Sequence, residues 1–165
     1  VEELTEIVTI NARKLNTPIR PEAAHELARC SRGTPRVANS RLWWTRSYAA
    51  SEGDGTIDHA IALAALKMAE VDVSGLDKQD RRYLDTLITV FEGGPAGVEA
   101  LAATMNLSSD TLSDEIEPYL LREQLIVRTP RGRMATMKAF HHLGKQPKKT
   151  DLESGQGLLF EGIDS

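Results

Sequence analysis

Three arginines lie within six residues in the segment Arg128-Thr129-Pro130-Arg131-Gly132-Arg133. The proline and the glycine are typical of a tight turn, so this segment is predicted to form the tip of a β-hairpin. Like charges at this spacing raise the free energy of the folded state unless a polyanion offsets them. We therefore interpret Arg128, Arg131 and Arg133 as contacts to a nucleic-acid backbone. The alternative is a solvated hairpin tip, which needs another reason to tolerate the repulsion.

A second candidate is Arg36, which ends the segment Arg32-Gly33-Thr34-Pro35-Arg36. The glycine and proline predict a tight junction between two helices, with Arg36 in the first turn of the second. Free backbone N–H groups and the positive end of the helix dipole favour an anion there. Residues 29–46 contain five arginines and no acid, so the Arg36 guanidinium could bind a phosphate. The alternative is a surface arginine that simply stands at a sharp turn.

The motifs of several enzyme classes are absent from the sequence. There is no Gly-x-x-x-x-Gly-Lys-Ser/Thr phosphate loop, and no apolar run ends in the Asp-Glu pair that would bind Mg²⁺. The four histidines are scattered and no cysteine accompanies them, so we predict no metal site. No Ser-His-Asp or Cys-His set is visible. The chain as given therefore contains no self-contained active site, and we assign no catalytic residue.

The charge is distributed unevenly along the chain. The whole chain carries −4, but residues 122–149 carry +7, which leaves −11 on the rest. A basic element on an acidic protein is typical of a confined nucleic-acid footprint, and a solvated basic tail is the alternative. The single cysteine, Cys30, excludes an intramolecular disulfide and fits a reducing compartment. The longest apolar run, residues 60–66, is too short to span a membrane. We expect a cytoplasmic protein without a membrane partner.

Helical periodicity dominates the first part of the chain. The spacing of apolar residues predicts four helices and no strand there. Thr34 and Asp58 are the predicted N-caps of the third and fourth helices, and Pro35 takes the first helical position of the third. A connector at residues 71–77 follows. The predicted helices cover residues 1–15, 20–31, 34–51 and 60–69.

The second part changes from helices to a hairpin. Three helices are predicted at residues 77–92, 97–105 and 110–123, and they are followed by a strand at 125–129 and a return strand at 134–136. Three helices and then a hairpin with a basic tip is the order of a winged helix-turn-helix. Residues 145–165 have few large apolar side chains and are predicted to form a disordered tail. The predicted fold class is mainly α, a four-helix unit followed by a winged helix with a small β-hairpin wing.

Four motifs carry a resemblance to a known family, because they occur in the family's order and at matching spacing. They are Gly33-Thr34-Pro35-Arg36-Val37-Ala38-Asn39, Gly93-Gly94-Pro95-x-Gly97, Glu117-Pro118-Tyr119-Leu120 and Arg128-Thr129-Pro130-Arg131-Gly132-Arg133-Met134-Ala135-Thr136. On these residues the sequence resembles the RuvB family, the ATP-driven motors of bacterial Holliday junction branch migration. The resemblance covers about residues 1–144. It implies an AAA+ lid at residues 1–74, a winged-helix DNA-binding domain at 75–144 and a tail at 145–165, without the family's N-terminal ATPase core.

The resemblance also implies a function and its residues. The chain would be the lid and DNA-binding portion of a branch-migration motor in DNA recombination and repair, inactive as an ATPase on its own. ATP, with Mg²⁺, would be bound mainly by the missing core, and Arg36 would be the sensor 2 arginine at the nucleotide phosphates. Arg128 and Arg133 match the family's DNA-contacting wing arginines, and Arg131 is a weaker candidate. The implied partners are double-stranded DNA or a Holliday junction, RuvA through the missing core, and further copies in a homohexamer of the bacterial cytoplasm.

The sequence departs from the family pattern at several positions. The family usually continues Arg-Leu-Leu-Arg-Arg-Val-Arg after the residue matching Asn39, where this chain has two tryptophans, Trp43 and Trp44. Trp43 lies on the same helix face as Arg36 and would pack either on the missing core or back onto its own lid. Gln124 replaces a glycine at a helix end, where a left-handed backbone would cost about 1 kcal/mol. Ser109 replaces an arginine near the DNA, which would weaken that contact.

Two other functions remain as alternatives. The first is a stand-alone winged-helix transcription regulator, which would need base-reading side chains on its third helix. Four acids make the predicted third helix a poor fit for the major groove: Asp110, Asp114, Glu115 and Glu117. The second is a helical interaction module with a basic tail.

Overall fold

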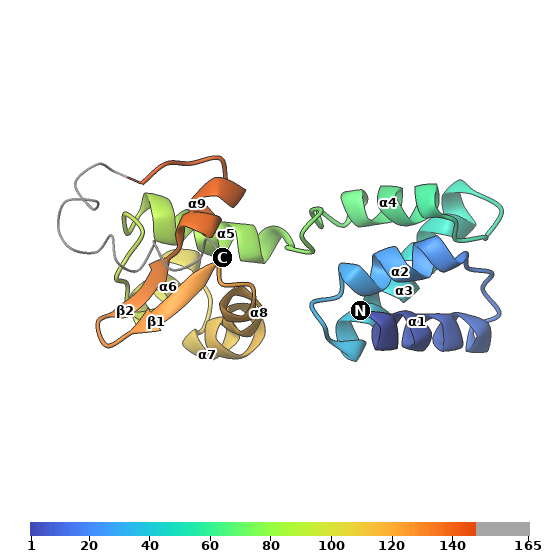
Figure 1. The fold of residues 1–165 in the computed structure, drawn as a ribbon, viewed down its shortest axis with the longest axis horizontal. Coiled ribbons are helices and arrows are strands. Elements are labelled where there is room, and N and C mark those ends of the chain that lie inside the picture. The colour runs from blue at the N-terminus through green and yellow to red at the C-terminus, as the bar shows by residue number, and fades with distance from the viewer. Residues whose placement is uncertain (148–165) are drawn as a thin grey trace. The chain divides into compact units, whose positions relative to one another are not determined.

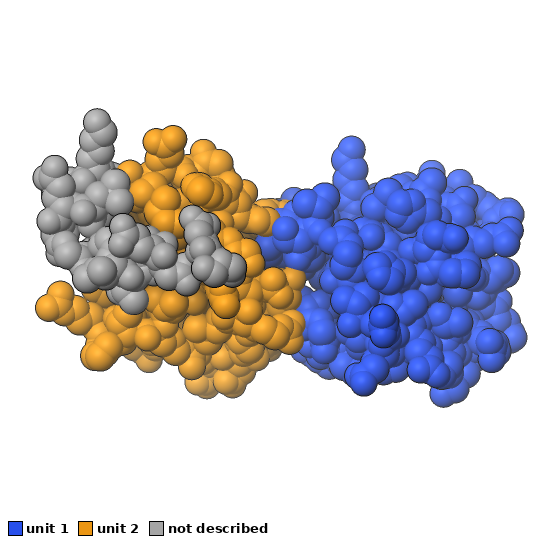
Figure 2. All heavy atoms as spheres, viewed as in Figure 1, with its two compact units in different colours: residues 1–78 blue, residues 79–165 orange. Residues whose placement is uncertain are grey.

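A computed structural model describes residues 1–147 of the chain, which fall into two compact units. Residues 1–78 form unit 1 and the residues from 79 onward form unit 2. Figure 1 traces the elements and Figure 2 colours the two units separately. The predicted fold class is confirmed, because the described chain is mainly helical with one small antiparallel hairpin. Most of the predicted tail, residues 148–165, lies outside the described residues.

Unit 1 consists of four helices, as the periodicity predicts. Their bounds are α1 (Glu2–Lys14), α2 (Pro21–Arg29), α3 (Pro35–Glu52) and α4 (His59–Met68). Both α1 and α4 pack against α2 and α3, and α1 and α2 lie side by side in Figure 1. The helices approach closely because alanines fill much of the core, around larger residues such as Leu27 and Leu42. A short parallel bridge between Ile19 and Ile57, which the sequence did not predict, ties two loops together.

The ends of these helices test the predicted caps. Asp58 is confirmed as the N-cap of α4, since its carboxylate accepts a hydrogen bond from the Ile61 N–H at 2.8 Å. Pro35 is the first residue of α3, as predicted. Thr34 occupies the N-cap position of α3, but the prediction that it caps the helix is wrong. Its hydroxyl instead donates to the carbonyl of Arg32 at 3.2 Å, because the tight turn brings that carbonyl within reach.

Unit 2 begins with helices α5 (Lys78–Thr89) and α6 (Val98–Met105). The predicted third helix is one helical path in three parts, α7 (Ser109–Thr111), a π-helical turn η1 (Leu112–Ile116) and α8 (Glu117–Arg122). Pro118 accounts for the π-turn, because proline has no N–H to donate and its ring clashes with the carbonyl four residues earlier. The N–H of Glu117 bonds to the carbonyl of Leu112 in this turn. The helix ends in a hydroxyl cap at its start, with Ser108 accepting from the Thr111 N–H.

A hairpin of strands β1 (Ile126–Thr129) and β2 (Gly132–Ala135) follows, here called the wing. Its register pairs Arg128 with Arg133 and leaves a two-residue loop, Pro130-Arg131. The backbone around Ala96 bonds to Arg133 on the other side of β2. Glycine is required at Gly132 and Gly94, because a Cβ would stand 2.4 Å from the Ala96 oxygen or 2.3 Å from the Arg133 oxygen. The Gly-Gly-Pro-x-Gly motif therefore lets its own segment lie against the wing.

Two further features complete unit 2. Gln124 has φ 56°, and the Leu125 N–H bonds back to the Leu120 carbonyl at 2.9 Å. The left-handed helix end predicted at Gln124 is therefore confirmed. A last helix, α9 (Met137–His142), was not predicted, and its N-cap is the hydroxyl of Thr136. No helix within residues 1–147 is long and apolar enough to cross a bilayer.

Candidate nucleic-acid and phosphate contacts

The tip of the wing is held by local hydrogen bonds. The Thr129 hydroxyl donates to the Gly132 carbonyl at 2.9 Å and accepts from the Arg131 N–H at 3.3 Å. These bonds fix the backbone of the loop and direct no side chain inward. Arg131 is exposed, and its guanidinium has no ion pair or hydrogen bond to any residue between 1 and 147. It is the arginine of the wing whose charge is fully available.

Arg128 and Arg133 are instead bound to one buried carboxylate, that of Glu117 on α8. Arg128 donates to Glu117 Oε2 from Nε at 3.0 Å and from Nη2 at 2.6 Å. Arg133 donates from Nε to Oε1 at 2.9 Å and from Nη2 to Oε2 at 3.3 Å. The hydroxyl of Tyr83, from α5, donates to Oε1 at 3.0 Å. Glu117 is fully buried and all of its partners lie within unit 2.

This cluster is tuned so that the carboxylate stays ionised. Burial by itself raises the pKa of Glu117, but hydrogen bonds from Arg133, Arg128 and Tyr83 outweigh it and hold the pKa below the ordinary value. Burial also raises the pKa of Tyr83, and the neighbouring Glu117 charge raises it further, so the phenol remains a donor. Two guanidinium charges against one carboxylate leave the cluster with one net positive charge.

The expectation that only a polyanion balances the wing arginines is wrong, because Glu117 already balances one of them. The three arginines are also not equivalent: the Arg128 side chain is 48% exposed and the Arg133 side chain only 19%. Their assignment as DNA contacts stays a prediction. Sequence reasoning counted Glu117 among the acids of an exposed helix and missed its role. Its place in the Glu117-Pro118-Tyr119-Leu120 motif, beside a buried Leu120, was the available sign.

The remaining acids of that helix, Asp110, Asp114 and Glu115, are exposed. They keep this face of the helix negative, as the sequence predicted. Ser109 is half-buried, and its hydroxyl donates to the Glu99 carboxylate at 2.6 Å. The serine therefore makes a contact inside the domain, and the weaker DNA contact expected at this position stays a prediction.

Arg36 lies exposed in the first turn of α3. Its guanidinium has no ion pair or hydrogen bond to the described residues, and Thr34 provides no side-chain cap to the N–H groups beside it. The other arginines of residues 29–46 are engaged. Arg29 pairs with Glu26 at 2.5 Å, Arg32 pairs with Asp77, and the Arg46 guanidinium lies 5.2 Å from the centroid of the Trp43 ring.

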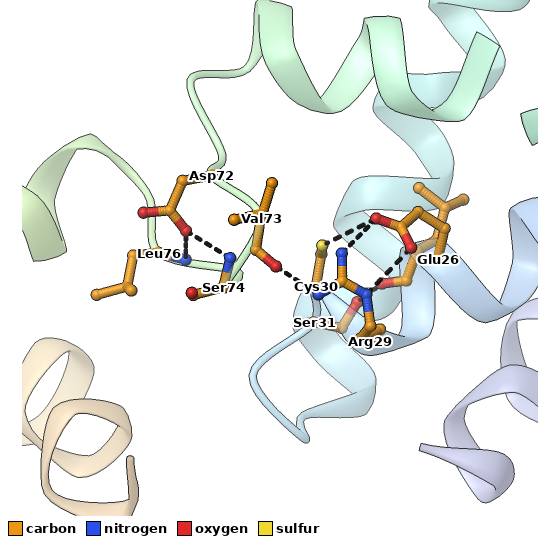
Figure 3. Close-up of polar contacts among 9 residues, drawn as sticks. Glu26, Arg29, Cys30, Ser31, Asp72, Val73, Ser74 and Leu76 are labelled. Atoms are coloured by element: carbon orange, nitrogen blue, oxygen red, sulfur yellow. Dashed lines mark hydrogen bonds and ion pairs between the residues drawn. The ribbon is translucent and has the colours of Figure 1, made fainter. Parts of the chain in front are cut away.

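The connector at residues 71–77 accounts for most of these contacts (Figure 3). Arg29 donates to the carbonyl of Val73, and the buried Arg41 donates to the carbonyl of Gly75 at 3.3 Å. Within the connector, the Asp72 carboxylate accepts from the N–H groups of Ser74 at 2.9 Å and Leu76 at 3.0 Å. Arginines of unit 1 therefore hold the connector by its carbonyls, and Arg36 is left over.

The two tryptophans differ in their surroundings. The Trp44 indole N–H donates to the carbonyl of Ala65 at 2.8 Å, so Trp44 is fastened to its own unit. Trp43 remains 51% exposed. Of the two packing partners expected for Trp43, unit 1 therefore covers only about half of the ring.

The fold and site define a helical lid followed by a winged helix, and comparison with known proteins identifies the family. Residues 1–72 match the profile of the RuvB AAA lid domain, and residues 73–144 match that of the RuvB C-terminal winged helix domain. The chain belongs to the RuvB family, of which it contains these two C-terminal domains. This membership favours the motor interpretation over a stand-alone transcription regulator.

Individual relatives agree with the family profile. The "Holliday junction branch migration complex subunit RuvB" of Rhodopirellula baltica is 57% identical over 145 residues, which is 88% of this chain and 40% of the relative. The "RuvB Holliday junction branch migration motor" of Thermotoga maritima is 39% identical with a TM-score of 0.84, covering 89% of this chain and 49% of that one. A point mutant of the same protein gives a TM-score of 0.85. The chain thus spans less than half the length of these relatives.

The domain boundary falls at slightly different places by different criteria. The two family profiles meet between residues 72 and 73, and the two compact units divide after Lys78. The predicted boundary after residue 74 lies between these positions and stays a prediction.

Proposed function

We propose that this chain supplies the lid and the DNA-binding part of an ATP-driven motor that moves Holliday junctions in recombination and repair. The observation that carries the proposal is the presence of both RuvB C-terminal domains, in order, over residues 1–144. An exposed Arg131 at the tip of the wing and a cluster with one net positive charge beside it support duplex binding. Contacts to phosphates rather than bases would make that binding independent of sequence.

Arg36 is the proposed link to the nucleotide. ATP, with Mg²⁺, would be held mainly by the ATPase core that relatives of this length carry, and it would supply the free energy for movement. Arg36 fits a phosphate contact because it is exposed, has no acidic partner among residues 1–147 and stands beside uncapped N–H groups of α3. In the same proposal the full-length protein forms a homohexamer in the bacterial cytoplasm and works with RuvA through that core.

The salt dependence of duplex binding tests the proposal. Three free arginines would give a log–log slope of about −3, but the Glu117 cluster offers only one net charge, so about two phosphates are engaged and the slope is about −2. Fluorescence anisotropy with labelled duplexes of unrelated sequence measures it. Similar affinities for all duplexes and a slope of about −2 are expected. A slope near zero would remove the DNA role, and strong preference for one sequence would favour a transcription regulator.

A further inference from the structure

The way Arg128 approaches Glu117 leaves one edge of its guanidinium unused. A guanidinium has five N–H donors in a planar fork. Arg128 turns its Nε and Nη2 side toward Glu117, so the edge formed by Nη1 and the outer N–H of Nη2 is not committed to this carboxylate. The side chain is 48% exposed, whereas that of Arg133, which uses the same two atoms, is 19% exposed.

From this geometry we infer that Glu117 is a positioning residue of the DNA contact, and that it holds Arg128 so that its free edge binds one backbone phosphate with two hydrogen bonds. Arg133 then has a structural role and fastens the wing to α8. Arg131 acts as a freely moving positive charge at the tip. The inference rests on the proposed function, because it assigns roles within a wing that is proposed to bind duplex DNA.

Preorganisation is the physical reason for such an arrangement. An arginine in solution loses side-chain entropy when it binds a phosphate in a fixed geometry, and a guanidinium already held on one side loses less. Two parallel N–H···O bonds to an anion are also stronger and more directional than a single charge contact. The buried carboxylate has three donors around it, from Tyr83, Arg128 and Arg133, and these restrict its own position.

Lysine substitutions separate a bidentate contact from a simple charge contact, because lysine keeps the charge but has no planar fork. We expect Arg128→Lys to weaken duplex binding about tenfold and Arg131→Lys to change it less than twofold, both with an unchanged salt slope. Arg133→Lys is the matched control for loss of the Glu117 ion pair, and we expect it to lower the melting temperature while affinity changes less than twofold. Equal effects of Arg128→Lys and Arg131→Lys, or a tenfold loss in Arg133→Lys, would overturn the inference.

Glu117→Gln gives a second test that depends on the sign of the effect. The substitution makes the chain one charge more positive, so electrostatics alone predicts tighter duplex binding. A positioning role predicts weaker binding, by about fivefold, at a temperature where circular dichroism shows the variant folded. Tighter binding would overturn the inference.

The two tests also distinguish the inference from the function on which it rests. If Glu117→Gln does not fold, the three lysine variants decide the matter. If the wild-type chain binds no duplex, both the proposed function and the inference are overturned. If the wild type binds with a slope of about −2 and the lysine variants are all alike, only the positioning role is overturned.

Discussion

The lid and the wing each contain a run of arginines, and each uses most of that run inside its own unit. In the lid, Arg29, Arg32 and Arg41 hold the connector. In the wing, two arginines share Glu117. The anchors differ, because the lid uses backbone carbonyls and a partly exposed Asp77, whereas the wing uses one fully buried carboxylate. In both units one arginine is left over, Arg36 and Arg131, and these are the residues with charge to offer a ligand.

The largest expected effect is on stability and concerns the buried anchor. Removing one partner of a buried ion pair leaves the others uncompensated, so Glu117→Ala should lower the free energy of unfolding by about 3 kcal/mol. The equivalent change in the lid, Asp77→Ala, should cost at most about 1 kcal/mol, because the Asp77 side chain is 37% exposed. Urea unfolding of both variants measures the difference, with the exposed Asp114→Ala as a control. Equal losses would contradict the distinction between the two anchors.

A smaller effect is expected in acid. The pKa of Glu117 is lower in the folded chain than its ordinary value near 4.5, so the folded state binds fewer protons than the unfolded state. The stability due to this group is complete above about pH 4.5 and is lost as the pH falls through the lower folded pKa. Glu117→Gln should therefore flatten the acid limb of the unfolding curve, measured by urea titrations between pH 3 and pH 7. An unchanged limb would show that the carboxylate is not charged in the folded state.

A third effect is a gain in stability at helix ends, and it compares the units under matched conditions. Gln124 and Glu70 both have φ 56° and both follow a helix with the same pattern of backbone bonds. Gln124→Gly should stabilise the protein by about 1 kcal/mol, because glycine adopts this conformation without strain. Glu70→Gly should gain less, since it also removes an exposed ion pair with Lys78. Thermal unfolding measures both, and a loss of stability in Gln124→Gly would contradict the assigned geometry.

The smallest effect on stability is expected at Arg36. Its side chain has no ion pair or hydrogen bond within residues 1–147, so Arg36→Ala should change the free energy of unfolding by less than about 0.5 kcal/mol. Function should respond strongly. In a chimaera that joins this chain to the ATPase core of the Rhodopirellula baltica relative, we expect Arg36→Ala to lower ATP turnover at least tenfold. Unchanged turnover would remove the phosphate role from Arg36 without affecting the wing.

Local patterns predicted most of the fold. The apolar spacing located the helices of both units, Asp58 was found as a cap, and Pro130 and Gly132 marked the hairpin loop. Each of these features depends on neighbours a few residues away. The short helix α9 was missed, because it has only six residues and follows a strand directly. The bond between Ala96 and Arg133 was missed because nothing in either segment alone specifies the other.

The site was harder to predict for the same reason. The arginines of the wing are visible in the sequence, but the carboxylate that binds them comes from α8 and the phenol from α5. The π-turn before Pro118 lies directly before Glu117, and helical periodicity does not predict such a turn. Arg36 was easier, since glycine and proline around it specify the junction locally.

The most direct measurement of the central claim is the salt slope of duplex binding for the wild type beside Arg131→Ala. The account predicts about −2 for the wild type and about −1 for the variant, because Arg131 offers a full charge and the Glu117 cluster only one more. The same slope in both chains would contradict it, because the charge at the tip of the wing would then make no contact with the DNA backbone.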